Sequence, residues 1–280
     1  AIQTQVARMG EQRAAAPAAS ASVDAGVGEE FSDGNKREDL YVFTVPDVSL
    51  KKGERIVVPI VEFELPYEDV FTVKLPVSPP REMLQQLNND QQKELARLLH
   101  APKAVHQARL TNRSDYPLTT APALLMRDGQ LLGQSMMTYT PVGGQVDVEM
   151  TAAVDITVAK QEAETNRTPN AANWAGNAFD RIDLAGKIRL RNFADKPVKL
   201  EVVRFVLGMV DTAGQDAVIS QLNMREDAWE LGTDFPAWWS WYGWPYGWFQ
   251  LNGMGRVRWQ LELPAGQEAT VEYTWHYFGR

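Results

Sequence analysis

The chain has 280 residues, of which 44% are hydrophobic and 23% are charged, so it can bury a full core. Its net charge of −8, with the basic residues scattered along the chain, disfavours binding to a nucleic-acid backbone. The absence of cysteine excludes disulfides, thiolate zinc sites and a cysteine nucleophile. No apolar run approaches the roughly 20 residues that span a bilayer. We therefore expect no transmembrane segment and one or two folded domains.

Residues 1–38 contain the low-complexity sequence AAAPAASASVDAGVGEE and few large apolar side chains. Such a segment cannot offset its own ordering entropy, so we expect an extended N-terminal arm that is held by a neighbouring copy or another part of an assembly. The sequence starts at Ala1 with no basic or hydrophobic leader. Such a start is expected either of a processed, exported protein, which we favour, or of a fragment of a longer chain.

The first β region is predicted over residues 39–160. Strand-like runs occupy 40–45, 54–65 and 70–75, and Lys52-Gly53 forms a turn between the first two. Pro59 lies inside the second run and has no backbone donor, so this strand is expected at a sheet edge, where another chain can dock.

A helical insert is predicted near residues 79–100, because leucines recur at helical spacing and Pro102 prevents continuation. The polar sequence Asn88-Asn89-Asp90 divides this stretch, so two short helices are an alternative to one. In either case the leucine stripe is expected to cover one face of a sheet.

Alternating strands then follow one another along the chain, and Asp128-Gly129 is a strong signal for a two-residue hairpin turn. Residues 161–180 are polar and break the alternation, so they are predicted to form a loop. A second β region is predicted over 181–280, ending in two strictly alternating strands. Serial hairpins with little helix predict a mainly β fold, an antiparallel β-sandwich or two such sandwiches.

Two stretches resemble the C-terminal β domain of mucoidy inhibitor A-like proteins. The first is RLTNRSDYPLTTAPALLMRDGQLLGQSMMTYTPVGGQVDVEM, residues 109–150, followed by VDITVAK; the second is KIRLRNFADKPVKLEVV, residues 187–203. Asn112, Pro117-Leu118, Thr140-Pro141 and Val154-Asp155 occupy the family's positions. The resemblance covers about residues 40–280, although the family's coiled-coil region is not seen. It implies a β-sandwich linked to the bacterial envelope or to exopolysaccharide, and supplies no catalytic residue.

The segment FPAWWSWYGWPYGWF, residues 235–249, is the most unusual part of the sequence. Gly243, Pro245 and Gly247 favour a tightly turning loop. Its rings could close over a sheet, form an interface between subunits, or provide a platform for a carbohydrate. The candidate interface or glycan contacts are Trp238, Trp239, Trp241, Tyr242, Trp244, Tyr246 and Trp248.

Catalytic signatures are missing from the sequence. It contains neither G-x-S-x-G nor H-E-x-x-H, and His100, His106 and His276 are not arranged in a motif. His276 is predicted on the solvent face of the last strand. A cleft like that of a glycosidase is one interpretation of the carboxylates before the aromatic run, and a calcium site is another. These carboxylates are Glu226, Asp227, Glu230 and Asp234.

Taken together, the sequence predicts a non-enzymatic structural or assembly protein of the bacterial cell envelope or extracellular space. We expect a homo-oligomer or polymer joined through the N-terminal arm, edge strands and the aromatic loop. The alternative is a carbohydrate-binding module that uses the aromatic loop to bind a polysaccharide. No catalytic residue, cofactor or metal ligand is assigned, and calcium has no support beyond the number of carboxylates.

Overall fold

The computed structural model describes residues 35–37, 40–42, 44, 47–75, 77, 84, 87–100, 104–223, 227 and 248–280. The chain divides into two units, residues 1–62 and residues 63–280. In the first unit, β1 (Asn35–Arg37) pairs antiparallel with β2 (Leu40–Val42). β2 lies in the run predicted as a strand, whereas β1 lies in the predicted N-terminal arm. The remainder of the predicted N-terminal arm, residues 1–34 and 38, lies outside the described residues.

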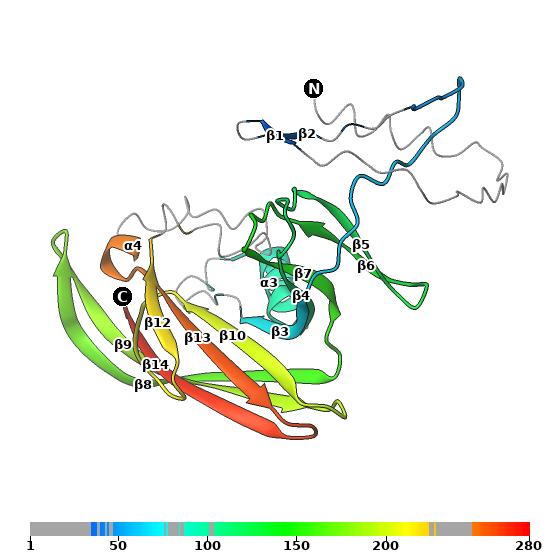
Figure 1. Ribbon diagram of the computed structural model, residues 1–280. Helices are drawn as coiled ribbons and strands as arrows, with labels where there is room; N and C mark the ends of the chain where they lie inside the picture. The colour runs from blue at the N-terminus through cyan, green and yellow to red at the C-terminus, as the bar shows by residue number, and fades with distance from the viewer. Residues whose placement is uncertain are drawn as a thin grey trace. The chain divides into compact units, whose positions relative to one another are not determined.

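The second unit is mainly β, as predicted, and its strands form two large sheets and a separate hairpin (Figure 1). The six-stranded sheet has the order β12 (Val218–Leu222), β13 (Met254–Leu263), β10 (Val198–Val206), β3 (Tyr67–Leu75), β4 (Ala104–Thr111) and β7 (Gln145–Ala152). The four-stranded sheet has the order β11 (Met209–Ala213), β14 (Glu268–Gly279), β9 (Asn177–Asn192) and β8 (Ile156–Trp174). The hairpin consists of β5 (Ala121–Arg127) and β6 (Gln130–Met137).

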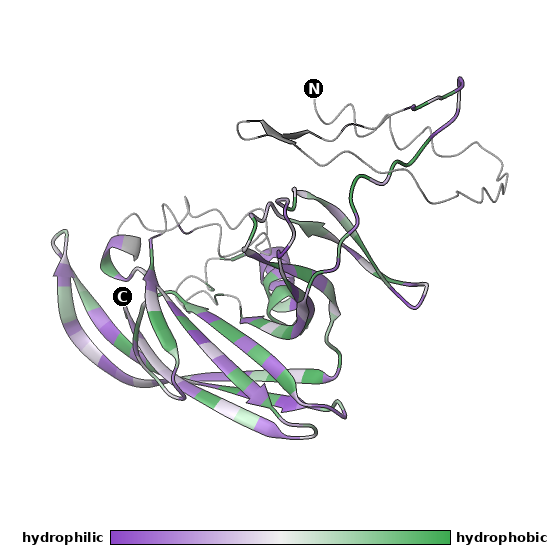
Figure 2. Ribbon diagram, viewed as in Figure 1, coloured by the Kyte–Doolittle hydropathy of each residue, from purple (hydrophilic) through white to green (hydrophobic). Residues whose placement is uncertain are grey.

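The main core lies between the two large sheets. Alternate residues of the strands are buried there, including Trp259 and Val202 from the six-stranded sheet and Ile188 and Tyr273 from the four-stranded sheet. Hydrophobic and hydrophilic colours accordingly alternate along these strands (Figure 2). The two predicted β regions share this core, because β3 of the first region pairs directly with β10 of the second. That pair is parallel, whereas the other strand pairs among the described residues are antiparallel.

Helix α3 (Asn89–His100) begins where the polar sequence was predicted to divide the helical insert. The Asn88 carboxamide oxygen accepts hydrogen bonds from the backbone N–H groups of Asp90 and Gln91, and the Gln91 side chain accepts one from the Asn88 N–H. This reciprocal pattern is a capping box and starts the helix at that point. Leu95 is buried in the main core, so the helix covers part of a sheet face as expected. A second helix, α4 (Trp248–Leu251), has a single turn.

Two predictions of local structure are wrong. Residues 161–180 are not a loop, because β8 continues to Trp174 and β9 starts at Asn177 after a turn at Ala175-Gly176. Most side chains on both faces of this ribbon are exposed. Its sequence therefore does not show the alternation of apolar and polar residues that indicates a half-buried strand. Residues 54–65 are in no strand, although their sequence is rich in β-branched residues.

Two corners of the second unit share a sequence pattern and equivalent hydrogen bonds from an asparagine side chain. Asn112 follows β4 and Asn192 ends β9, and each begins the pattern Asn-x-(Ser/Ala)-Asp-x-Pro. Each side-chain amide donates to three backbone carbonyls. For Asn112 the acceptors are Tyr116 (2.9 Å), Thr140 (3.2 Å) and Pro141 (3.3 Å); for Asn192 they are Lys196 (2.8 Å), Leu263 (3.1 Å) and Pro264 (3.2 Å).

The equivalent corners belong to a duplicated unit of five strands. Thr111 pairs with Gln145 just outside the first corner, as Arg191 pairs with Glu268 at the second. Leu118 bridges Thr140 and Val198 pairs with Leu263 on the other side of each corner. The first repeat is therefore β3, β4, β5, β6 and β7, and the second is β8, β9, β10, β13 and β14. In this correspondence the β5–β6 hairpin is equivalent to the β10–β13 pair.

Candidate functional site

The aromatic contacts predicted from the sequence fall outside what the structure describes. Residues 228–247 are not described, and for Trp248 only the backbone, at the start of α4, is described. Glu226, Glu230 and Asp234 also lie outside the described residues. The Asp227 carboxylate accepts a hydrogen bond from the backbone N–H of Asn223 (2.8 Å), so it closes a local turn. The roles of the aromatic loop in an interface or on a sugar therefore remain predictions.

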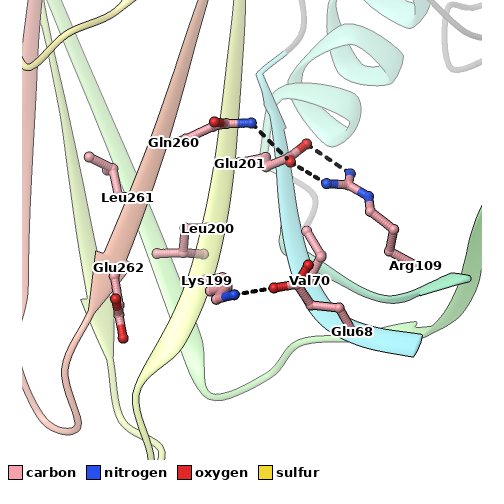
Figure 3. A pocket seen from close by; sticks show the side chains of 9 residues that line it. All are labelled: Glu68, Val70, Arg109, Lys199, Leu200, Glu201, Gln260, Leu261 and Glu262. Carbon is pink, nitrogen blue, oxygen red and sulfur yellow. Dashed lines mark hydrogen bonds and ion pairs between the residues drawn. The ribbon is translucent and has the colours of Figure 1, made fainter. Parts of the chain in front are cut away.

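A ladder of charged side chains crosses the outer face of the six-stranded sheet. Arg109 on β4 donates two hydrogen bonds to Asp147 on β7 (2.7 and 2.8 Å) and two to Glu201 on β10 (2.6 and 3.1 Å). Gln260 on β13 donates a further bond to Glu201 (3.3 Å). Figure 3 shows the Arg109 guanidinium reaching past β3 to Glu201. The two carboxylates raise the pKa of Arg109 further, so this side chain stays charged.

A hollow of about 320 Å³ lies along this ladder, between Arg109 and Glu262 (Figure 3). Lys199 donates to Glu68 at its rim, and Val70 and Leu261 contribute its apolar surface. The cations and most of the carboxylates around the hollow already pair with each other. It therefore offers a shallow surface of paired charges and apolar side chains.

A second charged network is buried inside the sandwich and joins the two sheets. Arg204 on β10 is only 1% exposed, and its guanidinium donates to both carboxylate oxygens of Glu162 on β8 (2.8 and 3.0 Å). Tyr273 on β14 accepts a bond from Arg204 (3.1 Å) and donates one to Glu162 (2.6 Å). Lys160 adds a third charge, with its amine 2.7 Å from Glu162. Opposite the Tyr273 ring is Gly186, where an added Cβ would overlap the ring.

Burial and the neighbouring charges together set the pKa values of the groups in this network. Burial opposes the charged form of Glu162, but the nearby Arg204 and Lys160 charges outweigh it and hold the pKa well below its usual range. Burial also lowers the pKa of Lys160 to about 8, with Arg204 acting in the same direction. The pKa of Tyr273 is raised, chiefly by burial. Two cations thus share one carboxylate inside the sandwich, an arrangement that ties β8, β10 and β14 together.

Asp183, Asp211 and His276 gather on the outer face of the four-stranded sheet, with their possible ligand atoms within 4.8 Å of one another. His276 is 7% exposed and its Nδ1 lies 2.8 Å from Asp211, so the prediction of a solvated histidine is wrong. Asp211 comes within reach because β11 has a bulge between Val210 and Thr212. Arg181 donates to both carboxylates (2.7 and 3.4 Å). Because the Arg181 guanidinium already donates to both carboxylates, we assign no metal here.

The other histidine whose side chain is described, His106, is also paired. Its Nε2 lies 2.7 Å from Asp69, and its ring stacks on Phe71 with the centroids 4.5 Å apart. Among the described residues, no hydroxyl group forms a hydrogen bond with His106 or His276. Within the described part of the chain, each of these histidines therefore pairs with a carboxylate and not with a hydroxyl group.

Residues 47–63 form an extended segment in which apolar and charged side chains are interspersed, and most of both kinds are exposed. Val57 is 92% exposed, and about half of the surface of several neighbours is exposed. The strongly exposed members of this set are Val48, Leu50, Ile56, Val57, Ile60, Val61 and Phe63. Figure 2 shows runs of hydrophobic colour along this segment before β3. Contiguous exposed apolar surface of this kind marks an interaction site.

The β5–β6 hairpin has a second exposed apolar surface. Its inner face carries Ala123, Leu125 and Met137, which pack on a small cluster formed by Leu118, Val146 and Val148. Its outer face carries Leu124 (57% exposed) and Met126 (59% exposed) on β5, with Leu131 and Met136 on β6. The hairpin turn itself has the predicted conformation, with positive φ at Asp128 and Gly129.

Comparison with known proteins gives no relative: no protein-family model, curated protein or solved structure matches the chain. In the part of the chain that the structure describes, no helix is long and apolar enough to cross a membrane.

Proposed function

We propose that this chain is a non-enzymatic structural protein that associates with copies of itself through the exposed segment 47–63. The observation that supports this function is the combination of a strand-like sequence with exposed apolar side chains. Ile56, Val57, Ile60 and Val61 favour a pleated, paired conformation, yet no sheet in the described residues contains them. A second chain would supply both the hydrogen bonds and the apolar cover.

The chemistry of the described residues supports a role without catalysis. In the two His–Asp pairs, the Arg109 ladder and the Arg204 network, the polar groups are engaged with one another. Such groups position strands, whereas a catalytic site needs a group that reaches the substrate. The resemblance to the mucoidy inhibitor A-like domain supports placing this assembly in the bacterial envelope or extracellular space.

The test is the particle mass by light scattering over a range of protein concentrations. We expect the intact chain to form particles larger than one copy. The double variant Val57→Lys/Val61→Lys should reduce the mass to that of a monomer, because two charges on the segment would have to be buried in the contact.

The matched control is Val154→Lys, at a position that is 84% exposed between β7 and β8. It adds the same side chain outside the segment and should leave the particle mass unchanged. A monomer at every concentration for the intact chain, or equal particle mass for the intact chain and the double variant, would refute the proposal.

A further inference from the structure

We propose that residues 54–63 of one copy add to the free edge of β5 in a second copy, as a parallel third strand of the hairpin. This inference rests on the proposed function and identifies the surface that receives the segment. It follows from the internal repeat, from the apolar pattern of the two partners, and from where the segment joins its own chain.

The internal repeat shows what the free edge of β5 can accept. Its equivalent, β10, pairs with β13 on one side and with β3 in parallel on the other. By contrast, β5 pairs only with β6 in the described part of the chain. A two-stranded hairpin is marginally stable in water, and a third strand gives it the arrangement that β10 and β13 already have. The repeat therefore predicts a parallel neighbour for β5.

The segment and the hairpin have matching apolar patterns. A strand that is buried on both faces reads as a continuous apolar run, and residues 56–61 read Ile-Val-Val-Pro-Ile-Val. The hairpin is likewise apolar on both faces, with Leu125 on the inner face and Leu124 and Met126 on the outer face. Adding the segment beside β5 would extend both apolar faces.

The parallel direction requires the segment of another copy. Leu65 packs on the small cluster with Leu118, three residues before β5, and the Pro66 carbonyl accepts a hydrogen bond from Thr111 at the end of β4 (3.2 Å). The C-terminal end of the segment is thus held near the start of β5. A strand parallel to β5 must instead end near Arg127, so the chain's own segment could only run antiparallel.

Cysteine crosslinking tests this arrangement cleanly, because the native chain has no cysteine. Copies carrying Val57→Cys or Val61→Cys are mixed with copies carrying Leu124→Cys or Met126→Cys and are oxidised. We expect disulfide-linked heterodimers with at least tenfold higher yield than with copies carrying Val154→Cys. In a parallel pairing Val61 crosslinks further along β5 than Val57 does; an antiparallel pairing reverses this order.

Light scattering on the same variants separates the two proposals. Particles larger than one copy without hairpin crosslinks would overturn this inference and leave self-association standing, whereas monomers throughout would overturn both.

A chain that carries both cysteines distinguishes whether the added strand comes from the same copy or from another copy. At low concentration an internal disulfide would show that the segment covers its own hairpin and would overturn pairing between copies. Folding of each variant is checked by its circular dichroism spectrum.

Discussion

The β10–β13 pair and the β5–β6 hairpin occupy equivalent places in the two repeats but have different surroundings. The first pair continues into β3 on one side and β12 on the other, and its inner face fills the main core. The second has two strands and packs on a small cluster. The shared corner pattern therefore accompanies an antiparallel strand pair in each repeat, but the neighbouring strands decide how much of each pair is buried. Stability should be concentrated in the second repeat and association in the first.

The largest expected effect is in the second repeat, at the buried network. Glu162→Gln removes the carboxylate that faces Arg204 inside the sandwich, and should lower the free energy of unfolding by about 3–5 kcal/mol. The control is Glu164→Gln on the same strand, where the partly exposed pair with Arg167 should contribute less than about 1 kcal/mol. Urea unfolding measures both. Equal effects at the two positions would contradict a special role for the buried pair.

The two corners provide a direct comparison of the repeats. Asn192→Ala leaves three buried or part-buried carbonyls without their amide donor beside the main core, so we expect a loss of about 2–3 kcal/mol in the unfolding of the whole unit. Asn112→Ala removes the equivalent bonds beside the small cluster. Its effect should be mostly local, seen as faster hydrogen exchange in β5 and β6. A larger global effect at Asn112 than at Asn192 would contradict the comparison.

The sequence predicts the elements that depend on turn and capping residues. It misses those that depend on which surfaces are buried and which strands find a partner. The Asp128-Gly129 turn correctly predicts the β5–β6 hairpin, and Asn88 marks the start of α3. Other successive strands, such as β13 and β14, alternate as expected but belong to different sheets. The ribbon at 161–180 was missed because solvent contacts both of its faces, so it lacks the alternating signal. Residues 54–65 were predicted as a strand because propensity says nothing about whether a partner exists.

The candidate sites were harder to predict than the fold. Arg204, Glu162 and Tyr273 meet only because two sheets pack face to face, and their distances in sequence give no hint of this contact. His276 is buried although it alternates with exposed residues, because the β11 bulge brings Asp211 to its ring. The repeated Asn-x-(Ser/Ala)-Asp-x-Pro pattern was a signal that an internal comparison of the sequence could have found.

The pH dependence of stability offers a smaller test of the second repeat. The pKa of Lys160 is about 8 in the folded chain and 10.5 ordinarily, so the unfolded chain binds more protons between these values. The contribution of Lys160 to the unfolding free energy should therefore rise with pH from 8 to 10, by at most about 1.4 kcal/mol per pH unit. Above pH 10 the raised pKa of Tyr273 opposes this trend, because the unfolded chain then loses its tyrosine proton first.

The variant Lys160→Met removes this contribution, so its stability should rise less steeply between pH 8 and 10 than that of the native chain. In the acid range the titration of Glu162 also makes the unfolding free energy fall as the pH falls. Its pKa is lowered on folding, so its contribution is present above the ordinary glutamate pKa and is lost as the pH falls below it. Thermal unfolding across pH measures both ranges. Parallel curves for the native chain and Lys160→Met would show that Lys160 titrates normally.

The smallest expected effect is at the surface ladder, which ties the first repeat to the second. Arg109→Lys keeps the positive charge but replaces a planar group that binds Asp147 and Glu201 with two hydrogen bonds each. Because these side chains are partly exposed, we expect a loss of only about 1 kcal/mol, most of it insensitive to salt since the charge remains. A loss that disappeared in high salt would mean that simple charge attraction, rather than bidentate geometry, holds β4, β7 and β10 together. Arg109 would then be exchangeable with lysine, and the junction between the repeats would depend on the β3–β10 hydrogen bonds and the shared core alone.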